Sequence, residues 1–90
     1  MAQAPLRFIQ IGTGGFGGYW ARQVLPRLIQ MGKLAPAAAV DIQQDHLANA
    51  VEGYSISPDL CFTDVQEAFG KVKADFAIIR AWKGDRYGNL

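Results

Sequence analysis

The stretch Gly12-Thr13-Gly14-Gly15-Phe16-Gly17-Gly18 decides the fold of this chain. It follows the apolar run of residues 6–11 and leads directly into a segment whose apolar residues recur at helical spacing. Gly12, Gly14 and Gly17 match the pattern G-x-G-x-x-G, which joins a strand to a helix where a dinucleotide binds its pyrophosphate. The stretch, called the glycine loop below, therefore predicts a nucleotide-binding turn.

Strand and helix patterns alternate on the carboxyl side of this loop. The expected strands are residues 6–11, 34–40, 61–62 and 75–79. The expected helices are residues 16–31, 45–51 and 65–72. The order β-α-β-α-β-α-β predicts an α/β fold with a parallel sheet and right-handed crossovers, a partial Rossmann fold. We expect residues 1–79 to form this nucleotide-binding domain and residues 80–90 to form an irregular tail.

The helix that follows the glycine loop has one strong stripe and one defect. Its apolar stripe, widened by Leu25 and Ile29, consists of Phe16, Trp20, Val24, Leu28 and Met31. Pro26 removes a hydrogen bond to the carbonyl of Arg22, so a kink or a break is expected there. Gly32 is a typical stop signal after the last turn.

Two further signals set the bounds of the later helices. Gly53 is expected to end the second helix. The third helix begins at a capping box, either Thr63 with Gln66 or Asp64 with Glu67. These acids are expected to cap the helix rather than to form an acid/base pair.

An acidic residue stands where a dinucleotide site needs one. Asp41 directly follows the second expected strand, 24 residues after Gly17, and an acid about 20 residues on binds the adenosine ribose hydroxyls. Residues 42–44 contain no Arg or Lys to meet a 2′-phosphate, which Asp41 would repel, so NAD is favoured over NADP. The expected cofactor-binding residues are Gly12, Thr13, Gly14, Gly15, Phe16, Gly17 and Asp41.

Other interpretations of the glycine loop stay open at this point. It could be a flexible linker, although it lies between two apolar periodic elements. The glycine loop of protein kinases has the same spacing, but a strand follows it there. Folds that bind S-adenosylmethionine or FAD share the glycine turn and the acid.

The composition of the chain limits the classes of function that it can have. Ninety residues form one small domain, and a formal net charge of +1 gives no footprint for nucleic acid. The single cysteine, Cys61, cannot form an internal disulfide or a metal cluster. No secretion signal and no apolar run of membrane-spanning length is present, so we expect a cytoplasmic protein without a membrane partner.

Three single residues have ordinary explanations that we prefer. His46 is expected at the surface of the second helix, and Cys61 is expected to be a small buried apolar group. Trp20 is expected in the core, with a place in the cofactor site as its alternative.

Four segments together resemble the Gfo/Idh/MocA oxidoreductases, the group of glucose–fructose oxidoreductase and inositol dehydrogenase. They are residues 8–17 (FIQIGTGGFG), 38–41 (AAVD), 61–64 (CFTD) with Val65 and Phe69, and 73–79 (KADFAII). The resemblance implies an NAD(P)-dependent oxidoreductase that acts on sugars, polyols or related small alcohols. The family's Glu-Lys-Pro motif is absent from this chain, and residues 80–90 do not resemble the family's next helix.

We therefore expect an amino-terminal, nucleotide-binding fragment that holds the dinucleotide but does not turn over a substrate alone. A small-molecule substrate is expected only in a full-length form. The strands at residues 6–11 and 75–79 are expected to have unpaired edges, which predicts self-association. The alternatives are a complete regulatory nucleotide-binding module and an interaction module that binds no ligand.

Overall fold

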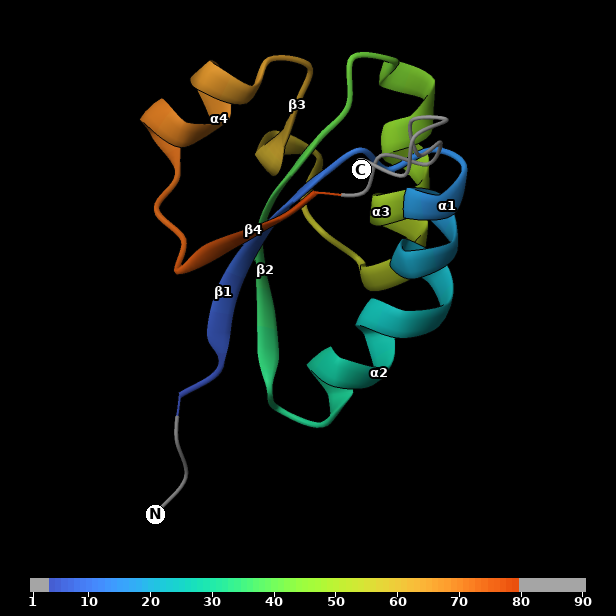
Figure 1. The fold of residues 1–90 in the computed structure, drawn as a ribbon, viewed down its shortest axis with the longest axis vertical. Coiled ribbons are helices and arrows are strands. Elements are labelled where there is room, and N and C mark those ends of the chain that lie inside the picture. The colour runs from blue at the N-terminus through green and yellow to red at the C-terminus, as the bar shows by residue number, and fades with distance from the viewer. Residues whose placement is uncertain (1–3, 80–90) are drawn as a thin grey trace, which may run out of the picture.

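A computed structural model describes residues 4–79 of the chain, which form an α/β fold around one sheet. The strands are β1 (Leu6–Ile11), β2 (Leu34–Val40), β3 (Cys61–Phe62) and β4 (Phe76–Ile79). All neighbours pair in parallel, in the order β3-β2-β1-β4 (Figure 1). This is the order 3-2-1-4 of the first part of a Rossmann sheet, so the expected fold class is confirmed. The expected tail, residues 80–90, lies outside the described residues.

Helices cover both faces of this sheet (Figure 1). On one face lie α1 (Phe16–Tyr19), a π-helical segment (Trp20–Val24), α2 (Leu25–Gln30) and α3 (Leu47–Tyr54), and on the other lies α4 (Val65–Lys71). The connections from β1 to β2 and from β2 to β3 move along the sheet in one direction, whereas the connection from β3 to β4 moves back. Right-handed crossovers of opposite direction place their helices on opposite faces.

The first helix is continuous through Pro26, so the expected break is absent, but its hydrogen bonding changes to a π turn directly before the proline. The N–H of Leu25 donates to the carbonyl of Trp20, five residues earlier, and Pro26 then stands in the first turn of α2. A residue in the first turn of a helix needs no N–H for an intrahelical hydrogen bond. Proline, which has none, therefore fits at this position after the π turn, and the helix continues. Gly32, with φ +78°, follows the last turn as the stop signal predicted.

The buried face of this helix is shifted from the expected stripe. Ala21 and Leu25 are fully buried, whereas Phe16 and Met31 at the ends of the stripe are 45% and 63% exposed. Trp20 is partly buried against the core, as expected. The small Gly17 and Ala21 let the helix lie close to the sheet, so the bulky residues move to its flanks.

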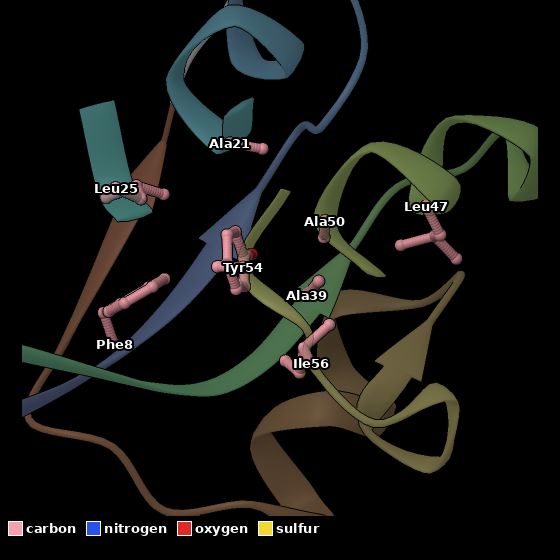
Figure 2. Close-up of a cluster of buried hydrophobic side chains, with 8 residues drawn as sticks. All are labelled: Phe8, Ala21, Leu25, Ala39, Leu47, Ala50, Tyr54 and Ile56. Carbon is pink, nitrogen blue, oxygen red and sulfur yellow. The ribbon is translucent and has the colours of Figure 1, made fainter. Parts of the chain in front are cut away.

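Two apolar clusters hold the layers together. The cluster between the sheet and the helices α1 to α3 contains Phe8, Leu25 and Tyr54, and the rings of Phe8 and Tyr54 meet edge to face at 5.5 Å (Figure 2). The cluster beneath α4 contains Ile9 and Phe62. Neighbouring residues of β1 thus serve opposite faces, as the period of a strand requires.

The second helix departs from its expected bounds at both ends, because a 3₁₀ turn at Gln44–His46 precedes α3, and the third helix ends one residue early. α3 runs through Gly53 and ends at Tyr54, where Ser55 takes the left-handed conformation with φ 61°. The expectation that Gly53 ends the helix is therefore wrong. A Cβ at Gly53 would clash with the carbonyl oxygen of Ala21, so this glycine serves a close helix crossing. Asp64, rather than Thr63, caps α4 by accepting from the N–H of Gln66 at 3.2 Å.

The sheet edges also differ from the expectation. β1 pairs on both sides, so the expected free edge at residues 6–11 is wrong. Within residues 4–79, no strand pairs with the outer edge of β4. No helix in this described part of the chain has the length and apolarity needed to cross a membrane.

Candidate functional site

A pocket of about 600 Å³ opens at the carboxyl ends of β1 and β2. Its apolar walls come from both strands and from the start of α4, and its polar groups come from the glycine loop and the segment after β2. The lining residues are Ile11, Gly12, Gly14, Gly15, Val40, Asp41, Ile42, Gln43, His46 and Val65. In open parallel sheets, ligands bind at the carboxyl ends of the strands, and a pocket of this size suits a nucleoside-sized group.

The glycine loop turns sharply at the end of β1. Gly12 has φ 90°, a conformation that favours glycine, and its N–H donates to the carbonyl of Val40 at 2.8 Å. A Cβ at Gly17 would clash with the carbonyl oxygen of Gly12, so only glycine lets α1 begin this close to the strand. The turn and the close packing are the roles that the first and third glycines of the motif predict.

The Asp41 carboxylate faces this loop from the end of β2 and is 8% exposed. Its Oδ2 accepts from the N–H of Thr13 at 2.8 Å and of Gly14 at 3.2 Å. Its Oδ1 accepts from the N–H of Gln43 at 2.8 Å. Asp41 and Gly14 are 27 residues apart in the sequence. These hydrogen bonds therefore join the acid and the glycine loop into one unit.

Two opposing effects act on the pKa of Asp41. Burial raises it, while the N–H groups of Gln43 and Thr13 and the nearby His46 lower it. The effects that lower the pKa outweigh burial, so the pKa of Asp41 lies below its ordinary value. Asp41 therefore keeps its negative charge at neutral pH and can accept hydrogen bonds from hydroxyl groups.

Thr13 is buried inside the unit and uses its polar groups there. Its hydroxyl donates to the carbonyl of His46 at 2.9 Å, and its carbonyl accepts from Nδ2 of Asn49 at 2.8 Å. Asn49 also accepts from Nε of Arg22 at 3.0 Å. The start of α3 thereby holds the glycine loop in place, a role for Asn49 that the sequence pattern does not reveal.

A second buried network supports the loop from below. Gln10 is fully buried in β1, where its Nε2 donates to the carbonyl of Gly17 at 2.9 Å and its Oε1 accepts from the hydroxyl of Tyr54 at 2.8 Å. Burial raises the pKa of Tyr54, so the phenol stays protonated and remains a donor. A single polar residue within an apolar strand is the sequence signal for such a network, and Gln10 provides it.

His46 lies beside Asp41 and lines the same pocket. Its Nδ1 is 3.4 Å from Oδ1 of Asp41. The imidazole occupies the place where Gly14 lacks a side chain, since a Cβ there would overlap the ring. With its side chain 43% exposed, His46 is a surface residue as expected, and it also contacts the site.

The structure divides the seven expected cofactor-binding residues into two groups. Gly12, Gly14, Gly15 and Asp41 line the pocket. Thr13, Phe16 and Gly17 do not: Thr13 and Gly17 are buried beneath the loop, and Phe16 stacks on Tyr19 with ring centroids 6.0 Å apart. A helix follows the loop, so the kinase arrangement and the flexible linker are both excluded.

Cys61 lies away from this pocket at the start of β3. It is partly buried, packs against the core beneath α3, and burial raises the pKa of its thiol. A raised pKa leaves little thiolate at neutral pH and gives Cys61 no mark of a nucleophile. Among residues 4–79, no group of three or more His, Cys, Asp or Glu side chains is placed to hold a metal ion.

A curated protein is similar in sequence to most of this chain. The uncharacterized protein y4oX of Sinorhizobium fredii (strain NBRC 101917 / NGR234) is 33% identical over 73 residues, which are 81% of this chain and 20% of that protein. The chain thus spans about a fifth of the length of the curated relative it matches. No protein-family model matches the chain, and no solved structure matches it.

Proposed function

We propose that this chain binds the adenosine side of NAD and serves as the nucleotide-binding part of an NAD(P)-dependent oxidoreductase. One observation carries the proposal. The Asp41 carboxylate and the glycine loop meet at the carboxyl edge of a sheet ordered 3-2-1-4, and both line the same pocket. That combination of acid, loop and strand order is the arrangement with which Rossmann folds bind a dinucleotide.

The loop and the acid divide the work of binding in this proposal. The pyrophosphate lies over the glycine loop, where a helix start supplies positive potential. The adenosine ribose donates its hydroxyls to Asp41, and the apolar walls at Ile11, Val40 and Val65 take the base. The pocket lining contains no Arg or Lys to offset a 2′-phosphate beside Asp41, which favours NAD over NADP.

The chemistry beyond binding is proposed only for a longer protein. The resemblance to the Gfo/Idh/MocA oxidoreductases suggests hydride transfer to or from a sugar, a polyol or a related small alcohol in the cytoplasm. The titratable residues that line the pocket, Asp41 and His46, belong to the adenosine side in this proposal, so neither is assigned to moving the substrate proton and the chain alone is proposed to bind without turnover. About four fifths of the relative's length lies outside the match, which leaves room for a substrate domain in that protein.

A titration that follows NADH fluorescence tests the binding. We expect saturable binding below about 1 mM for the wild type. Affinity should fall at least about tenfold in Asp41→Ala, because a hydrogen bond to a charged group contributes about 1.5–3 kcal/mol. Asp41→Asn, which preserves the side-chain volume, provides a second variant if Asp41→Ala folds poorly. Asp45→Ala, which removes an exposed acid from the neighbouring turn, should bind as the wild type does.

Three outcomes of this titration separate the parts of the proposal. If the wild type shows no saturable binding, the cofactor role fails. If Asp41→Ala binds NADH as well as the wild type does, the ribose role of Asp41 fails while the pocket stands. If NADPH binds more tightly than NADH, the preference for NAD is wrong.

A further inference from the structure

The backbone hydrogen bonds that the Asp41 carboxylate accepts leave one of its lone-pair positions unused. A carboxylate offers about four lone-pair positions. The backbone N–H groups of Thr13, Gly14 and Gln43 take three of them at 2.8, 3.2 and 2.8 Å. The hydroxyl proton of Thr13 goes to the carbonyl of His46 at 2.9 Å, which is shorter than its 3.3 Å approach to Asp41. A ribose hydroxyl therefore has one position left to use.

The imidazole of His46 lies beside the Asp41 oxygen that has this position free. Its Nδ1 lies 3.4 Å from Oδ1 of Asp41, the oxygen that receives one backbone hydrogen bond rather than two. This contact is the longest of the four, and it comes from a side chain that is 43% exposed and can rotate away. The three backbone donors cannot leave without unfolding the loop.

The same imidazole also covers the glycine loop. It lies against Gly14 at the place where this glycine lacks a side chain, and both residues line the pocket. Asp41 is the only other titratable residue in the pocket lining, and the described loop residues 12–18 contain no charged side chain. The two polar requirements of a nucleotide, an acceptor for the sugar and access to the loop, therefore meet at His46.

We propose that His46 gates the pocket and helps to select its ligand. This inference rests on the proposed binding of a dinucleotide. The sugar moves the imidazole away from Oδ1 of Asp41, and a sugar hydroxyl donates a hydrogen bond to the position that is exposed. A ligand without that hydroxyl displaces the imidazole without gaining this bond and binds more weakly, because a hydrogen bond to an ionised group is among the stronger ones.

Variants of His46 and of a neighbouring residue test the gate. NADH is titrated with the wild type, His46→Ala, His46→Gln and the matched control Gln44→Ala. We expect His46→Ala to bind roughly two- to fivefold more tightly than the wild type, as for the loss of a partly exposed polar contact. His46→Gln, which keeps a polar side chain at this place, should resemble the wild type. Gln44→Ala should follow the wild type.

Competition measurements examine the sugar. ADP should displace NADH from the wild type more strongly than its 2′,3′-dideoxy form does, and the difference should persist in His46→Ala because Asp41 remains. Equal displacement by the two compounds would overturn the proposed hydrogen bond from a sugar hydroxyl to Asp41.

The failure of the gate is distinct from the failure of the proposed function. If the wild type binds NADH saturably and His46→Ala binds equally or more weakly, the gate is wrong and the nucleotide site stands. If neither protein binds NADH, the nucleotide site is wrong and the gate falls with it. If only His46→Ala binds, the gate is supported in its strongest form.

Discussion

The hydroxyl of Tyr54 donates a 2.8 Å hydrogen bond to Oε1 of Gln10 and thereby joins the end of α3 to the carboxyl-terminal part of β1. Both side chains are buried, and Nε2 of Gln10 passes the connection on to the carbonyl of Gly17. The glycine loop therefore depends on an aromatic residue 37 positions after Gly17 in the sequence. The same ring packs edge to face on Phe8, so Tyr54 serves the core and the site together.

Removing this hydroxyl should destabilise the protein. Tyr54→Phe preserves the ring but leaves Oε1 of Gln10 buried without its donor, at a cost of about 1–3 kcal/mol in the free energy of unfolding. Urea denaturation followed by circular dichroism measures the change. Tyr19→Phe removes the hydroxyl of a tyrosine that is 55% exposed, and we expect it to change stability by less than about 0.5 kcal/mol. Equal effects of the two substitutions would contradict the role of the network.

Two glycines in helices should respond to alanine with opposite signs. Gly53→Ala places a Cβ against the carbonyl oxygen of Ala21 and should cost about 1–3 kcal/mol, because the backbones of α3 and the π-helical segment must separate. Gly70→Ala in α4 meets nothing within 4 Å and should stabilise the protein by about 0.5–1 kcal/mol, since alanine favours the helix. Thermal unfolding of both variants checks the pair. Stabilisation by Gly53→Ala would show that the two helices are free to move apart.

The sequence predicts the framework of this fold well because the framework follows from local patterns. The apolar run at residues 6–11 and the glycine turn each have a composition typical of one element, and the run at residues 34–40 is assigned to a strand by its length and its place after the first helix. The partners of Asp41 are harder to foresee. The acid can be placed at the end of β2 from its position alone, but its contact with His46 depends on how the short turn at Gln44–His46 directs the ring.

Errors in the prediction come from contacts between elements. Gly53 has the pattern of a helix stop, yet its small size serves a crossing with Ala21 that no local window contains. Proline breaks helices in general, but here a π turn directly precedes Pro26 and the helix continues. In both cases a tertiary arrangement overrides a local preference.

Acid should weaken the link between Asp41 and the glycine loop. The pKa of Asp41 is lower in the folded protein than its ordinary value, so the folded state binds this proton less readily than the unfolded chain does. The stability that the ionised carboxylate contributes is therefore fully present above about pH 4 and is lost as the pH falls through the lowered pKa. Urea unfolding across this acid range should show a steeper loss for the wild type than for Asp41→Asn. The exposed Asp45→Asn should follow the wild type, and a wild-type slope in Asp41→Asn would assign the acid sensitivity to other groups.

The outer edge of β4, with which no strand of residues 4–79 pairs, should drive self-association of the chain. β4 is Phe-Ala-Ile-Ile without a charged residue, and Phe76 and Ile79 are 39% and 67% exposed. Among the described strands only β1 pairs with it, and an uncharged open edge is a template for pairing with another chain. Sedimentation velocity over a range of concentrations should show a dimer or larger species for the wild type. Ile79→Lys, which places a charge on this edge, should shift the distribution to the monomer, whereas Gln66→Lys on the exposed side of α4 should not. Monomeric wild-type protein at every concentration, or equal association of both variants, would rule out β4 as the contact.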